Sequence, residues 1–277
     1  MPVDRMEDAM WGLIGALMLG AVPQGATPPP VLAEPCAMPA DFRPPATHVY
    51  RLKGGGTLVF VAVLHGDNGP TRVMLQEDFA RYKPGDVLVE GFSSTRGMDP
   101  AYRQRMLGYA ERRTAAGRPD EVTTAITLAA AAGTAVSGWD LTTAEDYAAS
   151  VRHGFAIEDV LGAHLLRLRI NPFAEANGTI VDAERREATM VTPVERFDYA
   201  DWYRRHYGTD FVAANGTPCG TGIGADIVRF ETAERNHRLV TVLQAHVGPG
   251  KIVLIEAGAN HWLALKPWLR SISDSAT

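Results

Sequence analysis

Three apolar runs of the chain each lead into a polar side chain that can do acid–base or metal chemistry. His65 follows "TLVFVAVL", Glu90 follows "DVLV", and His261 comes shortly after "KIVLIEA". Buried parallel strands have such continuous apolar runs, and ligands bind beyond their carboxyl ends. Two imidazoles and a carboxylate are ligands that zinc, manganese or cobalt accept. They also suffice for hydrolysis without a metal, because a histidine near its free pKa can take a proton from water.

Each of these residues also has an ordinary structural explanation. His65 can cap a strand and bond the turn "GDNG", whose composition suits a turn by itself. Glu90 is harder to explain in this way, because a carboxylate that ends a buried strand costs desolvation unless it is paired. His261 alone is compatible with either interpretation. In the functional interpretation, Gly258 lets the backbone turn so that His261 faces the strand ends. Asp67 is then a candidate for orienting one of the histidines by a hydrogen bond.

A late helix adds a candidate cation. In "FETAERNHR", Glu231 and Arg235 are four residues apart, as are Glu234 and Arg238, so both pairs can bridge along a solvated surface. Alternatively, Arg235 points toward the strand ends. There it would hold Glu90 or stabilise an oxyanion with two hydrogen bonds.

Other motifs in the sequence give weaker evidence for a functional site. The glycine-rich "GTGIGAD" from Gly220 precedes a helix but lacks a preceding strand and a P-loop lysine. The spacing of His153 and His164 does not place them on one helical face, which predicts surface or packing roles. The sequons at Asn177 and Asn215 matter only if the chain passes through a glycosylating pathway.

The elements that must position these residues alternate along the chain. Apolar runs predict strands at residues 57–64, 87–89, 134–140 and 252–256. Helical spacing occupies most of the intervals, and in the first helix Val73, Leu75 and Phe79 are expected to face inward. Residues 171–192 fit neither pattern. This alternation predicts an α/β fold with a mostly parallel central sheet flanked by helices. The predicted helices are residues 70–82, 100–117, 121–132, 143–151, 157–169, 195–206 and 225–246.

Composition sets the broad class. The 277 residues are 46% hydrophobic, enough for a sizeable core, and the net charge is −5. No basic run is interleaved with aromatics, so nucleic acid is not an expected partner. We expect a signal peptide at residues 1–26, a Pro-rich linker at 27–47 and a single α/β hydrolase-like domain at 48–277.

The expected signal peptide rests on an apolar run at residues 9–22 followed by small residues, with cleavage near Ala26. The run falls short of the roughly 20 residues that span a membrane. The residues before it are acidic where a positive charge is usual, and a short anchor or an interfacial helix is the alternative. We expect a periplasmic or secreted protein with no stable membrane span after cleavage. In an exported chain, Cys36 and Cys219 can form a disulfide, although two unpaired thiols fit as well and a thiol nucleophile has no recognisable context.

Four motifs, "VAVLHGD", "DVLVEGF", "AERNHRLV" and "LIEAGANHW", resemble in this order those of the TraB/Tiki superfamily, which is similar to the erythromycin-esterase-like and ChaN-like groups. The resemblance implies that His65 and His261 belong to two Gly-x-x-His motifs, that Glu90 ends the second strand and that Arg235 is the helix arginine. Ala62 stands where the first motif has glycine. Tiki-like members are described as metal-dependent peptidases, erythromycin esterases as lactone hydrolases with a histidine base, and ChaN-like members as haem binders. A shared fold does not fix the chemistry.

The leading hypothesis is a metal-dependent hydrolase whose substrate is a peptide or a small ester. His65, Glu90 and His261 would hold a divalent metal (Mn, Co or Zn) or activate water, and Arg235 would orient Glu90 or stabilise negative charge. The alternative is a ChaN-like haem- or metal-binding protein without turnover. A third interpretation is purely structural, with both histidines capping strands. The sequence leaves the substrate, the metal and the oligomeric state open.

Overall fold

The computed structural model describes residues 36, 38–65, 68–96 and 99–276. The expected signal peptide, the first part of the expected linker and Asp67 lie outside the described residues, so those predictions stay predictions.

The centre of the structure is a six-stranded sheet with the order β4-β3-β5-β2-β1-β6. Strands β4, β3, β5 and β2 run parallel to one another, whereas β1 is antiparallel to both β2 and β6. This confirms the predicted α/β fold with a mostly parallel sheet. The strands are β1 (Ala46–Leu52), β2 (Thr57–Val63), β3 (Asp86–Ser93), β4 (Ala135–Asp140), β5 (Ile252–Gly258) and β6 (Ser273–Ala276).

The four mutually parallel strands β2, β3, β4 and β5 correspond to the four predicted runs, and the two missed strands, β1 and β6, lie at one edge of the sheet. All seven residues of β2 are buried, which explains its uninterrupted apolar sequence. Strand β1 is only partly buried and β6 is a polar tetrapeptide, so neither leaves an apolar signature. Because β1 begins at Ala46, the folded domain starts slightly earlier than the predicted boundary at residue 48.

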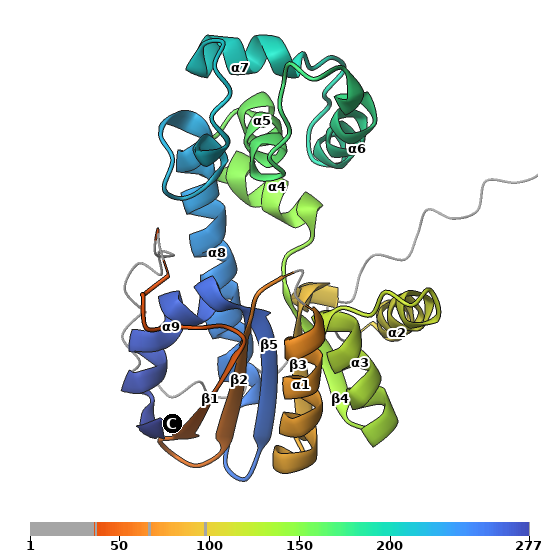
Figure 1. Ribbon diagram of the computed structural model, residues 1–277, viewed down its shortest axis with the longest axis vertical. Coiled ribbons are helices and arrows are strands. Elements are labelled where there is room, and N and C mark those ends of the chain that lie inside the picture. The colour runs from red at the N-terminus through yellow and green to blue at the C-terminus, as the bar shows by residue number, and fades with distance from the viewer. Residues whose placement is uncertain (1–35, 37, 66–67, 97–98, 277) are drawn as a thin grey trace, which may run out of the picture. The chain divides into compact units, whose positions relative to one another are not determined.

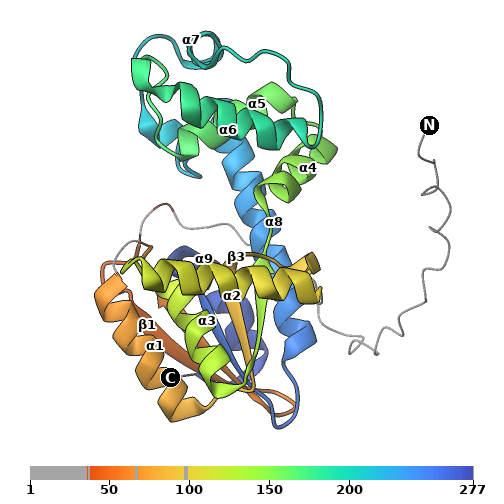
Figure 2. The same cartoon turned by 90° about the vertical axis from the view of Figure 1, so that its right-hand side faces the viewer.

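Helices cover both faces of the sheet, as Figures 1 and 2 show. On one face, β2, β3 and β5 pack against α1, α2 and α3 through residues such as Val61, Val89 and Leu254. The other face packs against α9 and the carboxyl-terminal half of α8. In α1, Leu75 and Phe79 face inward as predicted, but Val73 is 53% exposed, so that part of the prediction was wrong. The helices are α1 (Asn68–Tyr82), α2 (Pro100–Ala115), α3 (Glu121–Ala132), α8 (Gly222–His246) and α9 (Ala259–Ser271).

A second, purely helical core is formed by α4 to α7 and the amino-terminal half of α8 (Figure 1). Its largest buried side chains include Trp202 and Tyr147. Helix α8 joins the two cores, because Ile227 packs in the helical core and Leu239 packs on the sheet. Residues 171–192, which sequence patterns left unassigned, contain α6. The bounds are α4 (Thr143–His153), α5 (Ile157–Arg167), α6 (Gly178–Thr189) and α7 (Tyr199–Tyr207).

A disulfide between Cys36 and Cys219 ties the start of the described chain to the glycine-rich loop before α8. The sequence left open a disulfide or two unpaired thiols, and the structure has the disulfide. Met38 and Phe42 pack against the sheet core, and the Phe42 ring stacks on Trp262 at 4.7 Å. The later part of the predicted linker at 27–47 is thus part of the folded unit. Among the helices of the described residues, none is long and apolar enough to cross a membrane.

Candidate functional site

The carboxylate of Glu90 is the point on which the predicted site residues converge. Arg235 donates from Nη2 to Glu90 Oε1 over 2.7 Å, and Gly258 donates its backbone N–H to Oε2 over 2.7 Å. His65 Nε2 lies 3.4 Å from Oε2, and His261 Nε2 lies 3.5 Å from Oε1. The structure therefore brings His65, Glu90, Arg235 and His261 together at the carboxyl edge of the sheet, although they span almost two hundred residues of sequence.

Arg235 anchors Glu90 rather than bridging along the helix surface. Besides its bond to Glu90, it donates from Nε and Nη2 to the two carboxylate oxygens of Asp140 over 2.8 and 2.7 Å. The expected Glu231–Arg235 surface pair is wrong: both side chains are buried, and Glu231 turns away to bind His164. Sequence reasoning missed Asp140, although it ends the predicted strand "TAVSGWD" just as Glu90 ends its own.

The neighbouring basic side chains keep Glu90 ionised. Burial alone would raise the pKa of the Glu90 carboxyl, but His261, His65 and Arg235 outweigh it and hold that pKa well below its usual range. Arg235 is likewise held charged: burial opposes its charge, but Asp140 and Glu90 raise its pKa. The result is a buried anion fixed in position by hydrogen bonds, which would be costly to build without these partners.

His65 lies between two carboxylates. Its Nδ1 donates to Glu121 Oε1 over 2.7 Å, while its Nε2 faces Glu90. Glu121 is the first residue of α3, and that helix end is fixed by a capping box between Asp120 and Thr123. The hydrogen bonds that His65 donates to Glu121 and then to Glu90 raise the pKa of His65 to about 11. Bonded in this way, His65 is an imidazolium at neutral pH, and it would have to lose a ring proton to bind a metal ion.

His261 is oriented by a neutral partner. Its Nδ1 lies 2.6 Å from Asn236 Oδ1, and an amide oxygen accepts a hydrogen, so Nδ1 carries the proton. The ring also packs edge-on against Trp139, with centroids 5.1 Å apart. The nitrogen left facing Glu90 is therefore Nε2, the one that can accept a proton. Asn236 directly follows Arg235 in "AERN", but an asparagine in a helix gave no sequence signal.

Gly258 is required for space, and the expectation of a sharp turn was wrong. Its φ of −52° and ψ of 141° are open to any residue. A Cβ at this position, however, would lie 3.0 Å from His65 Nε2 and 3.5 Å from Glu90 Oε2. His261 reaches the site because α9 begins directly at the strand end, not because the backbone adopts a glycine conformation.

A second pair of carboxylates lies beside His65. Glu256 on β5 is completely buried, and its Oε2 accepts the backbone N–H of Glu90 over 3.2 Å. Burial, followed by the nearby charges of Glu90 and Glu121, raises the pKa of Glu256 well above its usual range. Oε2 of Glu121 and Oε1 of Glu256 are both buried without a hydrogen-bond partner among the described residues. Such orphaned carboxylate oxygens favour a bound cation.

These residues fit a metal ion better than the predicted ligand set does. Among the described residues, His65, Glu121 and Glu256 bring three ligand atoms within 4.8 Å of one another. One imidazole and two carboxylates suit Mn, Co or Zn. The predicted set of His65, Glu90 and His261 shares only His65 with this group, and the Glu90 oxygens already accept hydrogen bonds from Arg235 and Gly258. Glu256 was read only as the end of a strand and Glu121 as the start of a helix.

The site opens into a pocket of about 360 Å³, a size at which small ligands bind. His65 is the accessible member of the cluster, with 54% of its side chain exposed, whereas Glu90 and His261 lie deeper. The lining residues are Met38, Val63, Leu64, His65, Glu90, Arg167, Arg235, Gly258, Ala259, Asn260 and His261.

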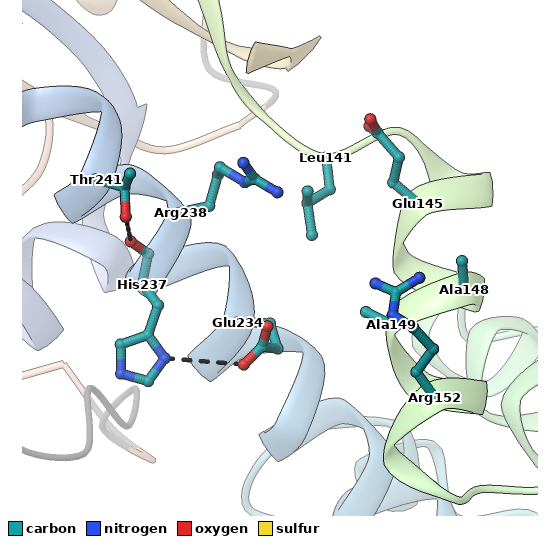
Figure 3. Close-up of a pocket in the computed structure, with 9 residues that line it drawn as sticks. All are labelled: Leu141, Glu145, Ala148, Ala149, Arg152, Glu234, His237, Arg238 and Thr241. Carbon is teal, nitrogen blue, oxygen red and sulfur yellow. Dashed lines mark hydrogen bonds and ion pairs between the residues drawn. The ribbon is translucent and has the colours of Figure 1, made fainter. Parts of the chain in front are cut away.

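Another pocket, of about 380 Å³, lies between α4 and α8 and is shown in Figure 3. Its lining includes the exposed Arg152, the partly buried Arg238 and Leu141. Its drawn ion pair, between Glu234 and His237, is 3.9 Å long and lies at the surface. This pocket lacks the buried hydrogen-bonded charges found around Glu90, so we place the candidate site at the sheet edge.

Of the two roles predicted for His164, surface or packing, the structure shows packing. It is buried in the helical core, where its Nε2 lies 2.9 Å from Glu231 Oε1 and its Nδ1 lies 3.6 Å from Glu184 Oε2. Burial opposes its charge, but Glu231 and Glu184 raise the pKa of His164 to about 9. This is a structural ion pair in the helical core.

Comparison with protein-family models, with curated proteins and with solved structures finds no match for this chain. The family resemblance therefore rests on the four motifs, and the function must be argued from the site.

Proposed function

We propose that this protein is a hydrolase of the TraB/Tiki type that cleaves a peptide or ester bond with the help of a divalent metal ion. The observation that carries the proposal is the ionised Glu90 carboxylate, fixed by Arg235 and Gly258 and faced by both histidines in an accessible pocket. Buried groups with strongly shifted pKa values, gathered in a cleft, are typical of active sites.

The geometry divides the chemical roles among the chain's own residues. Glu90 and His261 would position a water molecule, and His261 Nε2 would accept its proton as the oxygen attacks the acyl carbon. His261 would then donate that proton to the leaving amine or alcohol as the bond to the acyl carbon breaks. Arg235 would act as a positioning residue for Glu90.

The metal proposal rests on the carboxylates beside His65. His65, Glu121 and Glu256 would hold the ion, which would supply a Lewis acid that polarises a carbonyl or lowers the pKa of water to about 7. The two orphaned carboxylate oxygens support this assignment. Asp67 stays a candidate for orienting a histidine, since it lies outside the described residues.

The test is hydrolysis by the purified full chain. Chromogenic esters and quenched fluorescent peptides would be assayed after chelation and after addition of Mn²⁺, Co²⁺ or Zn²⁺. We expect metal-stimulated turnover that falls about 100-fold or more in His261→Ala and Glu90→Gln, while His237→Ala, at an exposed histidine of α8, retains it. Absence of turnover on both substrate classes with every metal would overturn the proposal.

Metal content separates the two candidate ligand sets. Elemental analysis of the wild type beside Glu256→Gln and His261→Ala should show metal lost in the first variant and retained in the second. The reverse result would assign the ion to His65, Glu90 and His261.

The second candidate function is haem or metal binding without turnover. The two histidines of the pocket, His65 and His261, suit it. Both of their Nε2 atoms, however, lie beside the Glu90 carboxylate, which favours acid–base chemistry. A Soret band on adding haem, lost in His65→Ala, would favour this candidate.

We further propose a periplasmic or secreted location, since the Cys36–Cys219 disulfide is of a kind that persists in oxidising compartments.

A further inference from the structure

Among the described residues that line the pocket, one charged side chain is used by neither the motifs nor the proposed chemistry. Arg167 is the last residue of α5, in the helical core, yet it lines the same pocket as His65, Glu90 and His261. About a third of its side chain is exposed (34%), compared with 10% for Arg235. Helix α5 of the helical core thus places a second guanidinium in the lining of this pocket.

The charge of Arg167 is not committed to hydrogen bonds among the described residues. Its Nη1 lies 3.6 Å from Glu231 Oε2, an ion pair longer than a hydrogen bond. Glu231 is already held through Oε1 by Ser150 and His164, each at 2.9 Å. Arg235, in contrast, donates three hydrogen bonds to Asp140 and Glu90. Arg167 can therefore offer its planar fork to a ligand without leaving Glu231 unbonded.

The backbone of Arg167 is held firmly while its guanidinium is not. Gly216 packs so tightly on the backbone of Leu166 and Arg167 that a Cβ there would overlap them. The loop that contains Gly216 is tied by Cys219 to Cys36, and Met38, two residues after Cys36, lines the same pocket. A firmly held backbone with an uncommitted guanidinium suits the recognition of a ligand.

We propose that Arg167 binds a carboxylate of the substrate that flanks the scissile bond, an inference that rests on the proposed hydrolase function. A guanidinium binds a carboxylate with two parallel hydrogen bonds. The substrates would be peptides with a free terminal carboxylate beside the scissile bond, or esters with a carboxylate in that place.

Paired substrates test this proposal. Each peptide would be assayed with a free and with an amidated carboxyl terminus, and each ester with a carboxylate and with its neutral amide. In the wild type we expect the carboxylate member of a pair to have the lower KM. In Arg167→Gln, the KM of that member should rise about tenfold to a hundredfold, with kcat and the neutral member little changed.

Matched variants separate recognition from folding. Arg167→Lys keeps the charge but loses the fork, so its KM should fall between those of the wild type and Arg167→Gln. Arg152→Gln, at an exposed arginine of α4 outside this pocket, should leave both KM values unchanged. Equal KM values within each pair in the wild type, or an equal rise for both members in Arg167→Gln, would overturn the proposal.

A binding measurement keeps this test separate from that of hydrolysis. Calorimetry of wild type and Arg167→Gln with an N-acetyl amino acid and its amide needs no turnover. If the wild type binds the acid but not the amide, Arg167→Gln loses this binding, and no substrate is hydrolysed, the proposed function is overturned and this inference is supported. Turnover without preference for the acid in either assay would support the proposed hydrolase function and overturn the proposed role of Arg167.

Discussion

At the scale of single residues, the site is decided by what is packed around Glu90. Arg235 lies between two buried carboxylates, those of Glu90 and Asp140, and neutralises both. Removing a cation from such a group leaves uncompensated buried charge, which costs far more than an exposed ion pair gains.

Arg235→Met should therefore lower the free energy of unfolding by about 3–5 kcal/mol. Urea unfolding measures this, and Arg238→Met, one turn along the same helix and only partly buried, is the control, with an expected change below about 0.5 kcal/mol. Equal effects in the two variants would show that the Glu90–Arg235–Asp140 group does not stabilise the fold.

Gly258→Ala should impair activity more than stability. The new methyl would lie 3.0 Å from His65 Nε2, so the partly exposed imidazole must move away from Glu90 while the backbone N–H still binds the carboxylate. We expect kcat/KM to fall about tenfold or more, with the free energy of unfolding within about 1 kcal/mol of the wild type. Gly85→Ala is the matched control, because its Cβ would meet nothing closer than 4.0 Å. A fully active Gly258→Ala enzyme would contradict a role for the position of His65.

At the scale of elements, the sequence predicted β2, β3, β4 and β5, but Glu90 lies inside β3 and does not end it as predicted. A strand buried on both faces must be a continuous apolar run, so His65 and Glu90 stand out where such runs stop. Glu256 also interrupts an apolar run, inside β5, and sequence reasoning missed it. Glu121, Asn236 and Arg167 lie on helices, where polar residues are ordinary, and only the packing of those helices brings them to the site.

The disulfide connects the segment that carries Met38 to the loop that packs on the backbone of Arg167, and both of these residues line the pocket. Cys36 and Cys219 are 183 residues apart, and removing a native bridge typically costs about 2–5 kcal/mol. Cys219→Ser, or reduction of the wild type, should lower the melting temperature and raise KM, because Met38 and the loop that holds Arg167 are no longer linked. The variant itself should be insensitive to reductant. An unchanged melting temperature on full reduction, with thiol content checked by a colorimetric reagent, would refute this.

At the scale of the whole molecule, α8 joins two cores that carry different charged groups. On this helix, Arg235 binds Glu90 at the sheet edge, and Glu231, one turn earlier, binds His164 in the helical core. Arg167 faces both, since it lines the pocket and pairs with Glu231. The stability of the helical core therefore bears on the geometry of the site.

The buried His164 makes that stability depend on pH. Burial opposes its charge, but Glu231 on α8 and Glu184 on α6 outweigh burial and Arg167 and raise the pKa of His164 to about 9. Because the folded pKa exceeds the unfolded value near 6.5, protonated His164 stabilises the fold fully below pH 6.5. That contribution, about 3 kcal/mol, should be lost as pH rises from 6.5 to about 9.

Urea unfolding of the wild type and His164→Gln at pH 6, 7.5 and 9 measures this contribution. The difference in free energy of unfolding between the two proteins should shrink with rising pH. Comparison with the variant removes the separate contribution of His65, whose pKa is also raised. His237→Gln, an exposed histidine of α8, should follow the wild type at every pH. A constant difference from pH 6 to 9 would mean that His164 is neutral in the fold, and Glu231 would then depend on Arg167 alone for its counter-charge.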